Sequence, residues 1–249
     1  MKKNYSTYHI HSDYSLLDSC TKWEDYVDYA KELGQTAIAS TEHGKPLGWV
    51  SKKMYCDKVG IKFLMGVEIY LTENLNEKIR DNYHTVLIAK NYNGVKELLK
   101  AVSISCQEDH FYYTNRMTFD EFLKLSSNVI KISACLASPL NKLPISHPTY
   151  ERLVKHYDYL EIQPHNHPDQ KAYNVLLAML AEKYKKPLIA GTDTHSLSPY
   201  KAECREILLK AKRKPYGDEG EFDLTYKTYD ELVEAFKQQD CIPENLYLQ

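Results

Sequence analysis

The stretch TYHIHSDYSLLDS, residues 7–19, places His9 and His11 two positions apart. The β-prone residues around the pair indicate a strand, in which residues i and i+2 point to the same face about 7 Å apart. A second pair with the same spacing, Asp193 and His195, occurs in AGTDTHS. Each pair can aim two donor atoms at one cavity. We therefore expect the two pairs to meet in a metal site.

The composition is that of an ordinary folded protein. The chain has 249 residues, of which 43% are hydrophobic and 27% charged, and its formal net charge is −2. Disorder is not expected at this apolar content, and the charge gives no overall basic surface for nucleic acid. The six cysteines include no CxxC pair. We expect a cytoplasmic protein without a membrane partner.

Strand and helix patterns alternate along the chain. Helical spacing is clearest from Trp23 to Leu33, where Thr21 and Glu24 predict a capping box. Alternation of this kind indicates βαβ units and a parallel sheet, either doubly wound or closed into a barrel. We expect one domain over residues 1–249, with 215–249 as a C-terminal loop and helix extension. The seven expected strands are Ser6–Ile10, Thr36–Ser40, Ile61–Leu71, Thr85–Ala89, Val129–Ser133, Tyr159–Gln163 and Pro187–Gly191.

Candidate ligands fall mostly where these strands end, which is the edge at which parallel α/β folds build their sites. His84 precedes its strand, and Asp18 lies several residues beyond one, so these two fit the pattern less well. The full set of candidate metal ligands is His9, His11, Asp18, His43, Glu68, His84, Cys135, Asp193 and His195.

Imidazole, carboxylate and thiolate together favour Zn²⁺, Mn²⁺ or Fe²⁺ over cations that prefer oxygen alone. Nine ligands exceed the needs of one tetrahedral ion, so we expect two or three divalent ions. The carboxylate of Glu68 can bridge two of them. Paired ions activate water and neutralise phosphoryl oxygens, which indicates hydrolysis of a phosphoester.

Each candidate also has a structural interpretation. Cys135 could be a small buried apolar side chain, Asp18 could cap a turn, and Glu68 could pair with a lysine. His165, in EIQPHNH, could be either a ligand or a substrate contact. The remaining histidines are expected to be structural: His110, His147, His156 and His167.

Several of these segments resemble the motifs of the polymerase and histidinol phosphatase (PHP) domain. They are residues 7–19, STEHGKPLG (40–48), MGVEIYL (65–71), HTVLIAKN (84–91) and GTDTHSL (191–197). Residues 110–140 and 159–184 are similar to blocks in the PHP domain of bacterial DNA polymerase III alpha subunits. The resemblance implies a distorted (β/α)7 barrel with a trinuclear centre.

By this resemblance, His9, His11, Glu68 and Asp193 surround one ion, Glu68, His84 and Cys135 a second, and Asp18, His43 and His195 a third. Glu68 and Asp193 are then catalytic, and Arg116 contacts phosphate, with Arg205 and Lys45 as weaker candidates. The chain departs from the family pattern in three places. Glu42 replaces an aspartate, and Ala134 and Ala137 stand where glycine is frequent.

The leading hypothesis is a metal-dependent phosphodiesterase, a 3′–5′ exonuclease of proofreading type that acts on DNA ends. The enzyme alternative is a small-molecule phosphomonoesterase of the histidinol phosphatase type. A third reading is a non-catalytic module that uses metal for stability or binds replication proteins.

Overall fold

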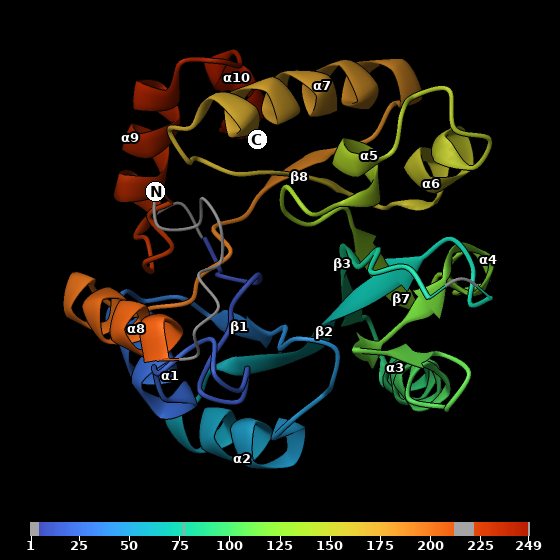
Figure 1. The fold of residues 1–249 in the computed structure, drawn as a ribbon. Helices are drawn as coiled ribbons and strands as arrows, with labels where there is room; N and C mark the ends of the chain where they lie inside the picture. The colour runs from blue at the N-terminus through green and yellow to red at the C-terminus, as the bar shows by residue number, and fades with distance from the viewer. Residues whose placement is uncertain (1–4, 77, 212–221, 249) are drawn as a thin grey trace.

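The computed structural model describes residues 5–76, 78–211 and 222–248 and shows a mixed α/β fold (Figure 1). Its largest sheet follows the order β1-β2-β3-β7, and β6 pairs with the far end of β2. The bounds are β1 (Ala37–Ser40), β2 (Lys62–Thr72), β3 (Tyr83–Ala89), β6 (Met117–Thr118) and β7 (Val129–Ile132). Two separate pairs are β4 (Phe111–Tyr112) with β5 (Thr114–Asn115), and β8 (Leu160–Ile162) with β9 (Leu188–Ala190).

The large sheet is mixed, and the expectation of a parallel sheet is wrong for β3. β1 and β2 are parallel, but β3 runs antiparallel to both β2 and β7. The register pairs Glu68 with Val86 and Tyr70 with His84. Because β3 is reversed, its beginning lies at the edge where β2 ends. This explains how His84 can precede its strand and still lie beside the other candidates.

Single bridges link segments outside the continuous strand ladders. Ile10 pairs with Thr194, and Ile132 pairs with Tyr159. The strand expected at Ser6–Ile10 is thus a short extended segment. Isolated hydrogen bonds join it to β1 and to the Thr194 region. These contacts are sparser than the continuous ladder of the expected (β/α)7 barrel. The described strands therefore establish a mixed α/β fold, and closure of the sheet into a barrel stays a prediction.

Helices cover the outside of the strands (Figure 1). α1, α2 and α8 lie near β1, α3 lies near β7, and α7, α9 and α10 lie together near β8. No helix in the described ranges is long and apolar enough to cross a membrane. The bounds are α1 (Trp23–Glu32), α2 (Trp49–Val59), α3 (Tyr92–Ser105), α4 (Phe119–Phe122), α5 (Pro139–Lys142), α6 (Tyr150–His156), α7 (Pro168–Tyr184), α8 (Pro199–Ala211), α9 (Tyr229–Gln239) and α10 (Glu244–Tyr247).

α1 confirms the helical spacing but not the predicted capping box. Trp23, Tyr26 and their neighbours on the same stripe are buried against the sheet. Each such side chain contributes about 1.5–3 kcal/mol when it is fully buried. The N-cap is Lys22, and the hydroxyl of Thr21 instead accepts a hydrogen bond from the Leu197 amide. Thr21 therefore ties α1 to the segment after His195.

The C-terminal helices pack into the main core. Leu232 and Phe236 of α9 belong to the same buried cluster as Tyr173 and Leu177 of α7. α9 begins with a capping box, in which Thr228 and Glu231 satisfy each other's backbone amides. The first part of the expected extension, residues 215–221, lies outside the described residues.

Candidate metal centre

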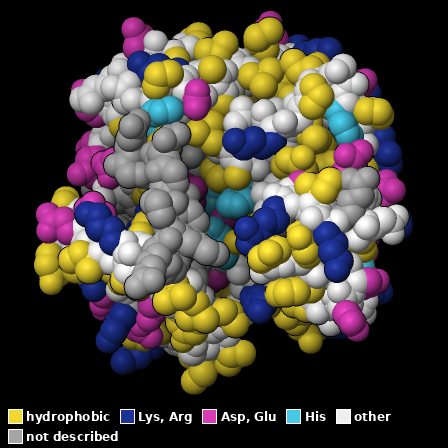
Figure 2. Space-filling model, viewed as in Figure 1, with side chains coloured by type: hydrophobic (Ala, Val, Ile, Leu, Met, Phe, Trp, Pro, Cys, Tyr) yellow, Lys and Arg dark blue, Asp and Glu magenta, His cyan; other side chains and the backbone are white. Residues whose placement is uncertain are grey.

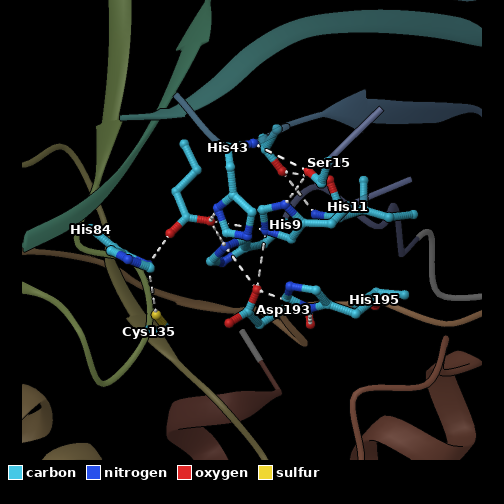
Figure 3. Close-up of polar contacts among 12 residues, drawn as sticks. His9, His11, Ser15, His43, His84, Cys135, Asp193 and His195 are labelled. Carbon is cyan, nitrogen blue, oxygen red and sulfur yellow. Dashed lines mark hydrogen bonds and ion pairs between the residues drawn. The ribbon is translucent and has the colours of Figure 1, made fainter. Parts of the chain in front are cut away.

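The structure brings the nine candidate ligands together from both halves of the chain (Figure 3). Eight of them form three overlapping groups, in each of which the donor atoms lie within 4.8 Å of one another. The groups are His9, His11, Glu68 and Asp193; Glu68, His84 and Cys135; and His11, His43 and His195. His11 and Glu68 each belong to two groups, so the three groups form one continuous cluster.

Glu68, on β2, lies at the middle of the cluster and is fully buried. Its Oε2 atom is 3.1 Å from His9 Nε2 and 2.9 Å from His11 Nε2. Its Oε1 atom contacts His84 Nδ1, which lies on the adjacent strand. The two oxygens therefore face different groups of donors, the arrangement that a bridging carboxylate needs.

Asp18 joins the third group from the loop that precedes α1. Its Oδ2 atom is 2.8 Å from His43 Nε2 and 3.0 Å from His195 Nε2. Its Oδ1 atom accepts a hydrogen bond of 2.7 Å from Arg205, whose Nε also donates to the Asp18 carbonyl. The resemblance assigned Asp18, His43 and His195 to one ion, and in the structure His11 lies with them as well.

Two ligand-bearing turns adopt the left-handed conformation that L residues rarely take. Ala134, immediately before Cys135, has φ 60°, and Asp193 has φ 46°. A residue with a side chain is disfavoured there by about 1–2 kcal/mol, and such conformations concentrate at functional sites. The glycine that is frequent at position 134 in the family thus corresponds to a backbone requirement that Ala134 meets with strain.

The charges in the cluster depend strongly on one another. Burial lowers the pKa of His11, but the carboxylates of Asp193 and Glu68 outweigh it and raise that pKa to about 9. Burial opposes ionisation of Glu68, yet His84, His43 and His11 hold its pKa well below its usual value. The pKa of the Cys135 thiol is raised by burial and by Asp193 and Glu68. Cys135 would therefore ionise only beside a cation.

The donor set fits divalent cations. Several buried atoms lie within ion-pair distance of other cluster atoms but form no hydrogen bond of normal geometry with the described residues: His11 Nε2, His43 Nδ1, Glu68 Oε1 and Asp193 Oδ1. Leaving such atoms unsatisfied costs about 1–3 kcal/mol each, and they face one another within the cluster. Cations are the partners that would satisfy nitrogen and oxygen lone pairs together. The residues can therefore bind metal, while the number and identity of the ions stay predictions.

Two buried residues that no sequence motif indicated, Glu161 and Ser15, fix the orientation of two imidazoles. Glu161 Oε1 lies 2.7 Å from His9 Nδ1 and also accepts a bond of 2.6 Å from Gln163 Nε2. The Ser15 hydroxyl lies 3.0 Å from His11 Nδ1 and donates to Glu42 Oε2 at 2.5 Å. Since the Ser15 proton goes to Glu42, His11 Nδ1 must be the donor to Ser15, and its Nε2 atom faces the cluster, where a cation would bind.

Glu42, at the position where the resemblance expects an aspartate, is buried and has several polar partners. It accepts hydrogen bonds from Ser12 and Ser15 and forms a buried ion pair with Lys52 of α2. The Lys52 ammonium also donates to Ser40 Oγ at 2.8 Å. The longer carboxylate thus links α2 and the end of β1 to the loop that carries the ligands.

A cavity of about 510 Å³ opens over the cluster and is lined by Asp18, His43, His84, Cys135, Asp193 and His195. Figure 2 shows histidine side chains in a hollow near the middle of one face, with Lys or Arg side chains beside it. Lys142 from α5 and the loop residues Gln163, His165 and His167 also line the cavity. A ligand in this space would touch the cluster on one side and these polar side chains on another.

Arg116 takes a position that does not support the predicted phosphate contact. Its side chain is buried, donates to the carbonyls of His110 and Ile79, and lies 3.5 Å from Asp81. It is not among the residues that line the cavity. Its contacts are those of a structural arginine. Arg205 is likewise engaged, by Asp18, and Lys45 is an exposed residue outside the cavity lining.

The histidines expected to be structural have protein partners. His110 lies between Asp109 and Glu121, His147 contacts Glu73, and His156 bonds to the Phe122 carbonyl. His167 is the N-cap of α7 but also lines the cavity, which its sequence context did not indicate.

The fold and this cluster define a PHP-type protein, and the comparison of families agrees. The PHP domain family matches residues 7–165, so the chain belongs to that family.

The relatives include replicative polymerases. The chain is 33% identical over 216 residues to the DNA polymerase III subunit alpha of Borreliella burgdorferi, covering 81% of this chain and 19% of the relative. It is 31% identical over 246 residues to that of Aquifex aeolicus, covering 86% of this chain and 20% of the relative. The chain thus spans about a fifth of the length of these relatives.

Solved structures with a similar fold include the following one. It is described as a metal-dependent phosphoesterase from Bifidobacterium adolescentis, with a TM-score of 0.56 and 13% identity, and the match covers 95% of this chain and 96% of that one.

Proposed function

We propose that this chain is a metal-dependent phosphoesterase that cleaves the terminal phosphodiester bond at DNA 3′ ends. The observation that carries the proposal is the continuous cluster, in which Glu68 and His11 each belong to two groups of donors at the floor of a cavity. A purely structural zinc site needs about four ligands. The similarity to polymerase III alpha subunits supports DNA as the substrate.

Within this proposal, His9, His11, Glu68 and Asp193 hold one ion, Glu68, His84 and Cys135 hold another, and Asp18, His43 and His195 complete the set. Divalent cations bound there supply the positive charge that activates water and neutralises a phosphoryl group. Glu68, which lies in the middle of β2, holds the central donor atoms at a fixed spacing. Asp193 and His43 keep 15% and 22% of their side chains exposed, and so present the cluster to the cavity.

Lys142 adds the one lysine or arginine side chain among the described cavity-lining residues. Its ammonium group can attract a phosphate group locally. No basic surface elsewhere is then needed, which agrees with the formal net charge of −2. The substrate is thus held between a cationic side chain and the cluster.

The decisive test is the release of nucleotides from single-stranded DNA in the presence of added Mn²⁺. Label at the 5′ end reports shortening from the 3′ end, and a phosphomonoester is assayed in parallel. We expect cleavage by the wild-type protein and loss of at least about 100-fold in Glu68→Gln. The matched control is Glu151→Gln, which removes an exposed carboxylate in a surface pair.

The outcomes separate the alternatives. Preference for the phosphomonoester would replace the exonuclease by a small-molecule phosphatase. A fully metallated protein that turns over neither substrate would overturn the proposal in favour of a metal-stabilised module.

A further inference from the structure

His165 lies in the wall of the cavity without belonging to the ligand groups. The whole residue is 6% exposed, and the Nε2 atom of its ring is buried with no hydrogen-bond partner among the residues that the structure describes. The ring packs edge-on against Phe222, with 5.2 Å between ring centroids. None of the three groups of metal-binding donors found in the described residues includes His165. The interpretation as a ligand is therefore not favoured.

The spacing of His165 from Glu161 and Gln163 along the chain also places it on the side of the cluster. Glu161, Gln163 and His165 alternate along the segment that leaves β8, the spacing at which extended residues share a face. Glu161 bonds to His9, Gln163 bonds to Glu161, and both Gln163 and His165 line the cavity. The last residue of the series thus comes next to the space above the ligands, and its Nε2 atom has no hydrogen-bond partner among the residues described.

Buried amides hold the backbone of this segment in place. Gln239 of α9 donates to the carbonyls of Gln163 and His165, at 2.9 and 2.7 Å. Asn174 of α7 donates to the Gln163 carbonyl at 2.7 Å and accepts from the Gln163 amide at 3.2 Å. Such bonds hold the backbone that carries the His165 side chain in place before a ligand binds. This preorganisation is required of a binding residue.

The ring of His165 is neutral at pH 7, because burial lowers its pKa to about 4. A neutral imidazole carries one N–H and one lone pair. All oxygens of a phosphodiester accept hydrogen bonds and none donates. A phosphodiester therefore favours the tautomer that carries its hydrogen on Nε2. The ring can adopt this tautomer because Nε2 has no competing hydrogen-bond partner among the described residues.

We propose that His165 is a substrate-binding residue whose Nε2–H donates a hydrogen bond to a phosphoester oxygen of the DNA end, an inference that rests on the proposed function. His165 then contacts the substrate from the wall of the cavity, while the cluster engages it from the floor and Lys142 from a further side. Because its N–H donor carries no charge, it adds no repulsion toward bound cations.

The test compares His165→Phe, which keeps a planar ring without a donor, with His165→Gln, whose amide nitrogen can replace Nε2–H. Three quantities are measured for each: bound Mn²⁺ per chain, affinity for thymidine 5′-monophosphate, and kcat/KM on bis(4-nitrophenyl) phosphate. We expect His165→Phe to keep its metal and to lose about 10- to 100-fold in affinity and kcat/KM. His165→Gln should recover part of that loss. The control is His147→Phe, a histidine outside the cavity lining, which should match the wild type.

Failure of this inference differs from failure of the proposed function. Wild-type affinity in His165→Phe would overturn the inference, as would loss of Mn²⁺, which would make His165 a ligand. Absence of nucleotide binding by the wild type would also overturn it. If the wild type binds the nucleotide but cleaves no substrate, the proposed function fails, and the nucleotide affinities still decide the role of His165.

Discussion

Glu161 and His9 form a fully buried pair, in which the carboxylate Oε1 lies 2.7 Å from imidazole Nδ1. Nδ1 donates to this carboxylate, so Nε2 is the ring nitrogen left to bind a cation. Nε2 lies 3.1 Å from Glu68 and 3.2 Å from Asp193. Glu161 therefore sets both the tautomer and the direction of the first histidine in the His-x-His pair.

Removal of this support should weaken metal binding without removing a ligand. We expect Glu161→Ala to lower the affinity for Mn²⁺ by about 10- to 100-fold, the usual effect of losing a group that orients a ligand. Glu161→Gln, whose amide oxygen can still accept from His9, should lose less. Competition with a chelating dye measures the affinity. Wild-type affinity in Glu161→Ala would show that His9 is oriented by other contacts.

Gly191 leaves the space that Glu161 occupies. A Cβ atom added at Gly191 would lie 2.4 Å from Glu161 Oε1 and 2.5 Å from its Cδ. We expect Gly191→Ala to lower the free energy of unfolding by about 1–3 kcal/mol, because the buried carboxylate must move.

The Gly191 effect should depend on Glu161. In the double variant with Glu161→Ala the clash disappears, so the two costs should not add. Urea unfolding of the four proteins measures this coupling. Additive costs would show that the strain lies elsewhere.

Ala134 gives a prediction about backbone strain. Both Ala134 and Ala39 are fully buried, but only Ala134 has a positive φ, of 60°. Glycine relieves about 1–2 kcal/mol of strain at a left-handed position and none in a strand. We therefore expect Ala134→Gly to be about 1–2 kcal/mol less destabilising than Ala39→Gly. Equal costs in urea unfolding would contradict the assigned strain.

His165 should make the metal-free protein sensitive to acid. Its pKa falls from 6.5 to about 4 in the folded chain, through burial first, and its charged or titratable neighbours are Asp193, His195, Lys227 and Asp223. The unfolded chain takes up a proton near pH 6.5 and the folded one does not. The free energy of unfolding should therefore fall as pH drops from about 6.5 to about 4, by about 3 kcal/mol.

The variant His165→Gln isolates this contribution. Its unfolding free energy should change less than that of the wild type between pH 7 and pH 4.5, with metal removed from both proteins. Parallel pH profiles from urea unfolding would show that the folded imidazole titrates near its usual pKa.

The spacing of His9 with His11 predicted that their side chains point to one cavity, because strand geometry is local. Asp193 and His195 also meet there, but Asp193 lies in a left-handed turn and not in a strand. The direction of β3 was not predictable in this way. Nothing in residues 84–91 distinguishes a parallel from an antiparallel strand, so His84 looked misplaced until its register with β2 was known.

The supporting residues were harder to find, because they are ordinary polar residues in sequence. Glu161 did leave one signal: it is a charged residue in the middle of an apolar strand, and a buried carboxylate needs a partner. Ser15 and Glu42 left none, since their partners come from separate loops. Arg116 was assigned from resemblance alone, and its hydrogen bonds to backbone carbonyls do not support that assignment.

The bridge between Ile10 and Thr194 has a consequence for how the protein is made. The His11 amide donates to the Thr194 carbonyl, and the Thr194 amide donates to the His9 carbonyl. On a ribosome, His9 and His11 are made more than 180 residues before Asp193 and His195. The complete cluster can therefore bind cations only after residue 195 has been made, and a chain terminated before that point would carry the first histidines without their partners.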